Sequence, residues 1–390
     1  MPPPPFIIDS HIHLWDSGDI DKLAWCKPED TLARRCTVED YVEAVNSTAP
    51  EAEESSSAGD GPRVGYIFVE CDRANDGGAD WTQPLAEVTM MRQIIEAEGE
   101  SSSTGSTASS QARCLAMVPW APVHSGPEVL ERYLDAVQEA AGPVAWPRVR
   151  GFRYVVQDKP HGTMLADDFV AGLRLLGRRG FVFELGIDQH RRGRTQMEET
   201  EALLDRLHGD DVPEAERVVL VVNHLAKPDL TVLNPAADRG FAAWRNAMFA
   251  LGKASPSHVF VKMSGLFSEM PDALRNQPSN AFFVATFPWF AVLLAALGPS
   301  RLMFGSDWPV CTARYASLLA VEGTASSDAE DAAATATTPD KKISKAEAGA
   351  WDKWRRIVAQ MCYMATLGED DEAMIWAGTA VKAYGLDTEK

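Results

Sequence analysis

The sequence predicts an α/β protein, a (β/α)8 barrel of the TIM type, from three observations. Eight short apolar runs alternate with helical segments along the 390 residues. The runs are nearly continuous in apolar residues, as are strands buried on both faces of a parallel sheet. No glycine-rich phosphate loop follows the first run, which removes the dinucleotide-binding form of the main rival, a doubly wound open sheet. We therefore expect a single barrel domain over residues 1–390.

The expected elements follow in order along the chain. The first strand begins at Phe6 with an apolar, β-branched run. Thr37 is a candidate N-cap for the first helix, because threonine side chains accept hydrogen bonds from the first turn. The other strands are expected at 64–70, 114–118, 149–155, 181–185, 218–224, 259–264 and 301–307. The other helices are expected at about 84–98, 127–141, 166–179, 195–208, 240–251, 282–297, 346–366 and 373–384.

Three low-complexity surface inserts interrupt this pattern, at about 47–62, 99–111 and 322–342. They are rich in Ser, Ala, Thr, Glu and Gly, a composition that buries too little apolar surface to order a chain. We expect each of them to follow a helix, and therefore to lie at the end of the barrel opposite the catalytic face.

Composition narrows the class of partner. The formal net charge is -19 and the pI is about 4.9, which disfavours nucleic acid and anionic membranes and leaves a small molecule. None of the six cysteines forms a CxxC pair. We find no signal peptide and no apolar run of membrane-spanning length, so we expect a soluble, reduced, cytoplasmic protein. The stretch 282–297 is apolar nearly all round, as in a buried helix or a homo-oligomer interface.

Polar residues close most of the expected strands. Active sites of barrels lie at the carboxyl ends of the strands, so these residues are candidates for chemistry. They are His11, His13, Glu70, Arg153, Glu184, His224, Lys262, Ser264 and Asp307.

His11 and His13 are the most informative pair. Residues i and i+2 of a strand point to the same side, so the two imidazoles project together. Such a pair at a strand end is half of a plausible metal site, although two half-buried structural histidines would give the same pattern.

Several motifs in this order resemble the amidohydrolase superfamily. They are Asp9-Ser10-His11-Ile12-His13-Leu14-Trp15-Asp16, Val222-Asn223-His224-Leu225-Ala226-Lys227-Pro228 and Phe304-Gly305-Ser306-Asp307-Trp308-Pro309-Val310. Within the superfamily they are most similar to the lactonase-type branch, which includes sugar-acid lactonases and pyrone-dicarboxylate lactonases. The similarity runs from Asp9 to about Tyr384, interrupted by the inserts.

The resemblance implies hydrolysis at an ester or related bond, with His11, His13 and Asp307 at the core of the site and His224 nearby. One feature departs from many members of the superfamily, which carry a metal-binding histidine after strand five. Here that strand ends in Glu184 and Leu185, with His190 several residues on. No lysine suited to a bridging carbamate is evident at strand four, so we expect one divalent metal, Zn2+, or none.

We expect the reaction to be the opening of a lactone, a sugar-acid lactone in particular. A single Zn2+ would lower the pKa of water to about 7 and polarise the carbonyl. Its expected ligands are His11 and His13 with a carboxylate from Asp307 or Glu70. Asp307 is the expected general base, and His224 would hydrogen-bond the carbonyl or bind the metal. The residues expected to hold the substrate are Arg153, Lys227, Trp15 and Trp308.

Three alternatives stay open from the sequence. A metal-dependent decarboxylase of the same superfamily would usually use the strand-five histidine that is missing here. A metal-free dicarboxylate lactonase would need several arginines in the pocket, and Arg150 and Arg153 are available. A non-catalytic binding protein on a barrel scaffold would have no reason to retain His11, His13 and Asp307 together.

Overall fold

The computed structural model describes residues 6–47, 63–76, 78–104, 112–232, 234–254, 256–275, 277, 279–313 and 342–387. Its strands run parallel in the order of the chain, in two hydrogen-bonded sheets. The first sheet contains β1 (Phe6–Ile12), β2 (Arg63–Val69) and β3 (Ala112–Val118). The second contains β4 (Gly151–Val155), β5 (Val182–Gly186), β6 (Val219–Val222), β7 (Val259–Met263) and β8 (Leu302–Phe304).

Two seams join these sheets into a barrel. Between β3 and β4 the backbone N–H of Arg150 donates to the carbonyl of Met117 (3.1 Å), and Met117 bridges to Val149. Between β8 and β1, Ile12 pairs in parallel with Trp308. The predicted (β/α)8 barrel is therefore confirmed.

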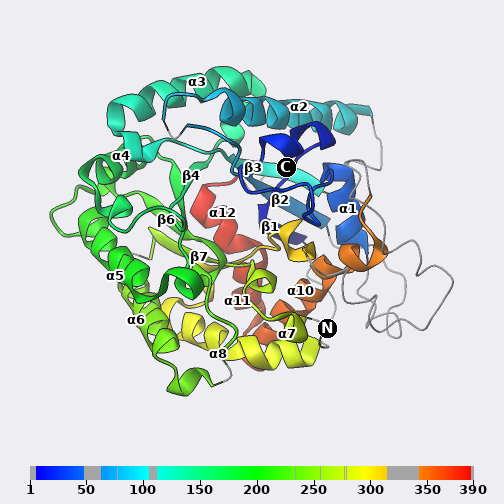
Figure 1. The fold of residues 1–390 in the computed structure, drawn as a ribbon, viewed down its shortest axis with the longest axis vertical. Helices are drawn as coiled ribbons and strands as arrows, with labels where there is room; N and C mark the ends of the chain where they lie inside the picture. The colour runs from blue at the N-terminus through cyan, green and yellow to red at the C-terminus, as the bar shows by residue number, and fades with distance from the viewer. Residues whose placement is uncertain are drawn as a thin grey trace.

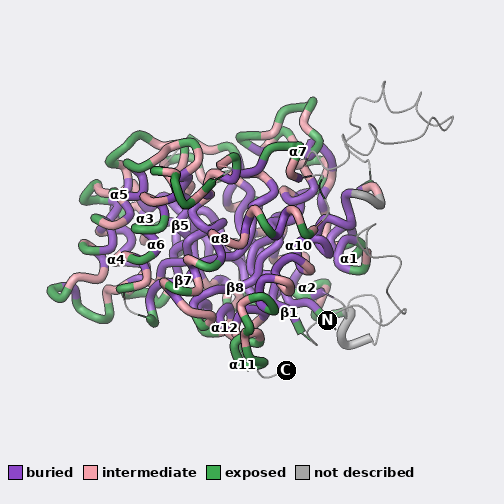
Figure 2. The backbone as a smooth tube through the Cα atoms, turned by 90° about the horizontal axis from the view of Figure 1, so that it is seen from below, coloured by how far each residue is buried: buried purple, intermediate pink, exposed green. Residues whose placement is uncertain are grey.

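Helices surround the barrel on the outside, as Figure 1 shows. They are α1 (Val38–Asn46), α2 (Thr82–Thr104), α3 (Pro127–Ala145), α4 (Asp167–Arg178), α5 (Gln189–His208), α6 (Arg239–Lys253), α8 (Ser279–Leu297) and α10 (Lys345–Met364). A last helix, α12 (Thr379–Tyr384), lies instead near the middle of the ring in this view. The short helices α7 (Asp272–Arg275) and α11 (Glu369–Ala373) lie at opposite ends of the molecule in Figure 2.

The core has two parts. Apolar side chains between the strands and the outer helices form the larger one. Figure 2 marks the buried residues along the backbone, which gather in the interior. The smaller part fills the barrel itself, where Ile8, Val69, Val221 and Phe260 pack together with Ala383 and Tyr384 of α12. The C-terminal helix thus plugs the amino end of the barrel.

The buried carboxylate of Asp9 ties four elements together. One of its oxygens accepts from the Ser306 backbone N–H (2.8 Å), and the other accepts from the Tyr41 hydroxyl and the Trp351 indole, both at 2.9 Å. Burial raises the pKa of Asp9, while these donors oppose that rise by stabilising the charged form. Asp9 therefore fixes the end of β1 against α1, α10 and the loop after β8.

Several predicted boundaries differ from the structure. The strand expected to run to His224 ends at Val222, because residues 223–226 turn sharply. The strand expected at 301–307 is short, Leu302–Phe304. Helix α5 begins at Gln189 with the Asp188 side chain as its N-cap, and it is kinked at Gly193, so that the part after the kink begins near Thr195, where the helix was expected.

The three predicted inserts are only partly within the described residues. Residues 48–62, 105–111 and 322–341 lie outside them, while residues 99–104 belong to the end of α2. The third insert lies almost wholly within the undescribed stretch 314–341, so its expected position stays a prediction.

All six cysteines lie in the described part of the chain, and all are free thiols. Helix α8 has the length and composition of a membrane span, with a mean hydropathy of 1.8, although no such run was expected from the sequence. Buried helices pass the same test, but only 39% of this window of α8 is buried. Phe282, Trp289 and Leu293 of α8 are buried in the core.

We predict that Trp351→Phe lowers the free energy of unfolding, measured by urea titration, more than Trp308→Phe does. Both indoles are fully buried, but only that of Trp351 donates a hydrogen bond, to Asp9. The expected difference between the variants is about 2 kcal/mol, the usual contribution of a hydrogen bond to a charged group. Equal losses would show that Asp9 does not need this donor.

Candidate active site

A cleft of about 250 Å³ opens at the carboxyl end of the barrel. Its size is at the small end for ligand sites, which suits a small molecule. The predicted site residues that line it are His13, Asp307, His224, Arg153, Lys227 and Trp15.

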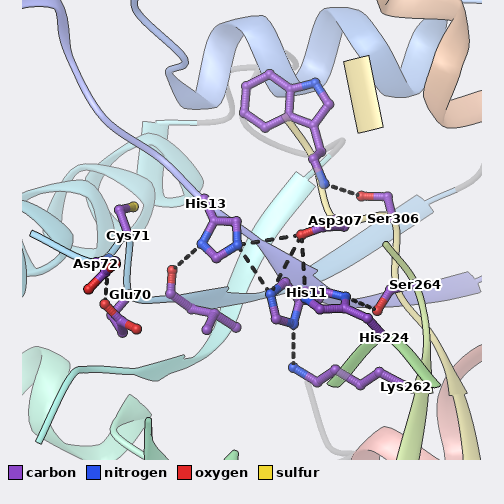
Figure 3. A network of polar contacts seen from close by, with 12 residues as sticks. His11, His13, Glu70, Cys71, Asp72, His224, Lys262, Ser264, Ser306 and Asp307 are labelled. Atoms are coloured by element: carbon purple, nitrogen blue, oxygen red, sulfur yellow. Dashed lines mark hydrogen bonds and ion pairs between the residues drawn. The ribbon is translucent and has the colours of Figure 1, made fainter. Parts of the chain in front are cut away.

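His11, His13 and Asp307 form a compact group of possible metal ligands (Figure 3). One nitrogen or oxygen atom from each lies within 4.8 Å of the others. The two Nε2 atoms are 3.1 Å apart, and Asp307 Oδ1 is 3.7 Å from His11 Nε2 and 3.5 Å from His13 Nε2. All three side chains are buried.

The backbone brings these residues together at the seam between β1 and β8. The Asp307 N–H donates to the carbonyl of His11 (2.9 Å), and the His13 N–H donates to the carbonyl of Trp308 (2.8 Å). Gly305 allows this approach, because a Cβ there would lie 3.2 Å from the Cβ atoms of His11 and Ser264. The two strand ends therefore present the three side chains to one point.

The group fits a divalent cation. His13 Nδ1 lies 2.9 Å from the carbonyl of Val69, and a carbonyl only accepts, so Nδ1 carries the proton and Nε2 offers a lone pair. Burial lowers the pKa of His11 well below its usual value, and nearby Lys262 adds to this, which keeps the ring neutral as a ligand must be. Two neutral imidazoles and one carboxylate are a donor set that Zn2+ accepts.

Asp307 is ionised at neutral pH. Burial alone would raise the pKa of its carboxyl, but His224, His13 and Lys227 more than offset this and hold the pKa below its usual value. Its backbone φ is +61°, a region that non-glycine residues rarely adopt and that often marks functional sites.

His224 lies beside the group on a strained turn. Residues His224 to Lys227 all have positive φ, between 46° and 61°, which costs about 1–3 kcal/mol per residue. The Trp244 indole holds the turn by donating to the carbonyl of Leu225 (2.7 Å). The imidazole lies 2.9 Å from Ser264 Oγ through Nδ1 and 3.9 Å from Asp307 Oδ1 through Nε2.

Glu70 is not brought into the ligand group. One of its oxygens accepts from Arg153 Nε (2.5 Å) and the other from the backbone N–H of Asp72 (2.5 Å), while its carbonyl accepts from Arg153 Nη2. Its predicted role as a ligand is therefore unsupported, because both oxygens are committed elsewhere. Arg153 itself remains in the wall of the cleft.

The two predicted tryptophans differ in position. Trp15 lines the cleft, packed edge-on against Trp25. Trp308 is fully buried against Tyr41 and is absent from the described lining of the cleft, so the structure does not support its predicted contact with substrate. The Trp308 side chain points into the core because the backbone turns at Asp307, where φ is positive.

Sequence reasoning missed several polar residues of the cleft, which are Asp72, Gln157, Asp158, Asn223 and Ser268. Asn223 is buried, and neither atom of its amide has a hydrogen-bond partner in the protein, which suggests a group that meets a ligand. Its place next to His224 was the available signal. Asp72 also lines the cleft, and burial together with the charge of Glu70 raises its pKa to about 6.

The chain is similar to proteins of one known enzyme family. The amidohydrolase family model matches residues 8–386. The chain is 30% identical to an L-rhamnono-gamma-lactonase of Scheffersomyces stipitis over 311 residues, 78% of this chain and 85% of that one. It is 30% identical to an L-fucono-1,5-lactonase of Burkholderia multivorans over 203 residues, 52% of this chain and 60% of that one.

Solved structures share the fold. An amidohydrolase from Burkholderia multivorans with bound zinc aligns with a TM-score of 0.61 at 22% identity, covering 98% of this chain and 100% of that one. A putative 2-pyrone-4,6-dicarboxylic acid hydrolase from Pseudomonas putida aligns with a TM-score of 0.51 at 17% identity, covering 99% and 100%.

We predict that His11→Ala and His13→Ala each abolish tight binding of Zn2+, measured by equilibrium dialysis with metal analysis. Each change removes one of the converging ligand atoms. His161→Ala is the matched control, because that histidine is 45% exposed and pairs with Glu199 away from the cleft. Retained binding in both cleft variants would mean that the metal is held elsewhere.

A second prediction concerns acid stability of the chelator-treated protein. Burial lowers the pKa of His224 from 6.5 to about 3. Between these values the unfolded chain binds a proton that the folded protein does not, so stability falls as the pH falls from about 6.5 to about 3. Relative to His224→Gln, the wild type should lose about 1.4 kcal/mol per pH unit within this range. A difference in the free energy of unfolding between the wild type and His224→Gln that stays the same at every pH, measured by urea titration, would contradict this.

Proposed function

The chain belongs to the amidohydrolase family, and from this premise we propose that it is a hydrolase that opens a lactone of a sugar acid. The observation that carries the proposal is the group of His11, His13 and Asp307, buried at the mouth of a barrel, where His13 and Asp307 line a small cleft. The identity to a rhamnono-lactonase along 78% of the chain supports the choice of reaction.

We assign one divalent ion to this group, with Zn2+ as the proposed metal. His11, His13 and Asp307 would hold it. When bound, such an ion supplies Lewis acidity, which lowers the pKa of water and polarises a carbonyl oxygen.

Asp307 acts as the general base in this proposal. Its carboxylate is ionised at neutral pH and borders the cleft, so it can take the proton of the attacking water. The same oxygen can then return that proton to the alkoxide that leaves when the ring opens. Asp72, with a pKa of about 6, provides a second carboxyl on the cleft that holds a proton for part of the time near neutrality.

His224 orients the carbonyl. It is neutral above about pH 3, and when the Ser264 hydroxyl donates to Nδ1, the proton of the ring is on Nε2, on the side of Asp307. This N–H can donate to the carbonyl oxygen of the substrate. Gly265 leaves room for the ring, because a Cβ at that residue would lie only 2.4 Å from Nδ1.

The rest of the cleft suits a polyhydroxylated ring. The Asn223 amide has both donors and an acceptor without a partner in the protein. Lys227 and Arg153 add positive charge to the wall, and Trp15 and Trp25 add flat apolar faces. Sugar hydroxyls can use the amide and the cations, while the ring carbons pack against the indoles.

The alternatives are less well supported. At the end of β5, where a metal-dependent decarboxylase would usually have a histidine, Glu184 is engaged by Lys262 and Tyr384. A metal-free dicarboxylate lactonase needs converging arginines, but Arg153 is the one arginine among the described residues that line the cleft, and Arg150 lines a separate cavity with Tyr384.

We also propose a cytoplasmic location. The support is the six free thiols, five of them buried, which are typical of proteins kept in a reducing compartment.

The test is hydrolysis of a panel of lactones, including L-rhamnono-1,4-lactone and L-fucono-1,5-lactone, followed by the release of acid. We expect turnover that a chelator abolishes and Zn2+ restores. Asp307→Asn should reduce kcat by about 10²- to 10⁴-fold, the usual contribution of a positioned base, whereas Asp135→Asn on the exposed face of α3 should not change it. No turnover on any aldonolactone would contradict the proposal.

A further inference from the structure

A line of buried polar side chains lies beneath the candidate metal site and extends to the C-terminal helix. Lys262 Nζ on β7 is 3.1 Å from His11 Nδ1 (Figure 3) and donates to Glu184 Oε1 on β5 at 2.7 Å. The Tyr384 hydroxyl at the end of α12 donates to the same oxygen at 2.7 Å. Relative exposure is 0% for His11, Lys262 and Glu184, and 3% for Tyr384.

The two oxygens of Glu184 are in different situations. Oε1 accepts from both Lys262 and Tyr384. Oε2 is buried without a hydrogen-bond partner and lies 3.7 Å from His11 Nδ1. A buried carboxylate oxygen with no donor is costly, so this orientation calls for an explanation.

The position of the ring proton of His11 explains why Glu184 Oε2 points towards His11. If Nε2 of His11 holds a metal, the proton of the neutral ring must be on Nδ1, and that N–H needs an acceptor. The Lys262 ammonium has only donors. Glu184 Oε2 is therefore the group beside Nδ1 that can accept, after a small closure of the 3.7 Å separation.

The alternative arrangement makes His11 unfit to be a ligand. If Lys262 donates to Nδ1, the ring proton is on Nε2 and points to His13 Nε2, 3.1 Å away. His13 accepts there, because its own Nδ1 faces the carbonyl of Val69. Which of the two nitrogens of His11 holds the proton thus depends on whether Lys262 or Glu184 controls Nδ1.

We propose that Glu184 is a positioning residue that makes His11 a metal ligand by accepting its Nδ1 proton, and that Tyr384 of the C-terminal helix holds Glu184 in place for this. The inference rests on the metal site of the proposed function but not on its lactone substrate. By binding Oε1 together with Lys262, Tyr384 leaves Oε2 directed at His11. Lys262 is itself held over the Tyr384 ring, 5.6 Å from its centre.

The C-terminal helix is therefore part of the site as well as a plug. Ala380, Ala383 and Tyr384 fill the amino end of the barrel among Ile8, Val182 and Phe260. The packing of α12 in the barrel determines how far the Tyr384 hydroxyl reaches along the barrel axis, and so allows its hydrogen bond to Glu184. A change at the opposite end of the barrel from the cleft should in this way alter affinity for the metal.

The test is the affinity for Zn2+, measured by competition with a chromophoric chelator, in Tyr384→Phe and Glu184→Gln. Loss of a group that orients a ligand typically weakens metal binding by about 10- to 100-fold, and we expect both variants to fall in this range. Tyr133→Phe is the control, because the Tyr133 ring is equally buried but its hydroxyl has no partner, so Zn2+ affinity should be unchanged.

A second readout separates positioning from general damage. In the Zn2+-loaded wild type, 15N NMR of the histidine side chains should show His11 protonated at Nδ1, and Tyr384→Phe should weaken this signal while the far-UV circular dichroism stays the same. Wild-type affinity in both Tyr384→Phe and Glu184→Gln would overturn the inference. A wild type that binds no Zn2+ would overturn it together with the metal site.

Lactone turnover is measured in a separate experiment. A wild type that binds Zn2+ tightly yet opens no lactone would overturn the proposed function, while the comparison of Tyr384→Phe with Tyr133→Phe would still decide the role of Tyr384.

Discussion

The structure depends first on the carboxylate of Asp9, which is buried where the barrel closes. It links β1 to α1, α10 and the loop after β8 through Tyr41, Trp351 and Ser306. The two backbone hydrogen bonds between that loop and the end of β1 need the two segments to be held in this register. His11, His13 and Asp307 can converge because the same seam carries all three. The residue that closes the barrel thus also assembles the site.

Much of the barrel and part of the site were predictable from the sequence. Apolar runs marked all eight strands, and the motifs identified His11, His13, His224 and Asp307, which the structure brings together. These predictions succeed because buried parallel strands have a simple pattern and because the polar ends of the strands meet at one face. What a polar side chain pairs with is set by tertiary contacts, and no pattern along the chain shows it.

The predictions that failed depended on tertiary contacts of this kind. Glu70 ends a strand as expected, yet Arg153 and the Asp72 backbone use both of its oxygens. Trp308 follows Asp307 in the sequence, but the backbone turns at Asp307, where φ is positive, and the indole is buried in the core. Glu184 was identified only as a strand end, and its link to Tyr384 spans 200 positions of sequence. The strained turn at His224–Lys227 could not be predicted either, because it contains no glycine, the residue that usually indicates positive φ.

The most direct measurement of the central claim is X-ray absorption at the zinc edge of the Zn2+-loaded protein. The account predicts a single zinc environment with two imidazole nitrogens at about 2.0–2.1 Å and carboxylate or water oxygens at about 2.0–2.2 Å, and loss of one imidazole contribution in His13→Ala. Zinc bound by sulfur, or a spectrum with the same two imidazoles in His13→Ala, would show that the ion is held somewhere other than at the seam between β1 and β8.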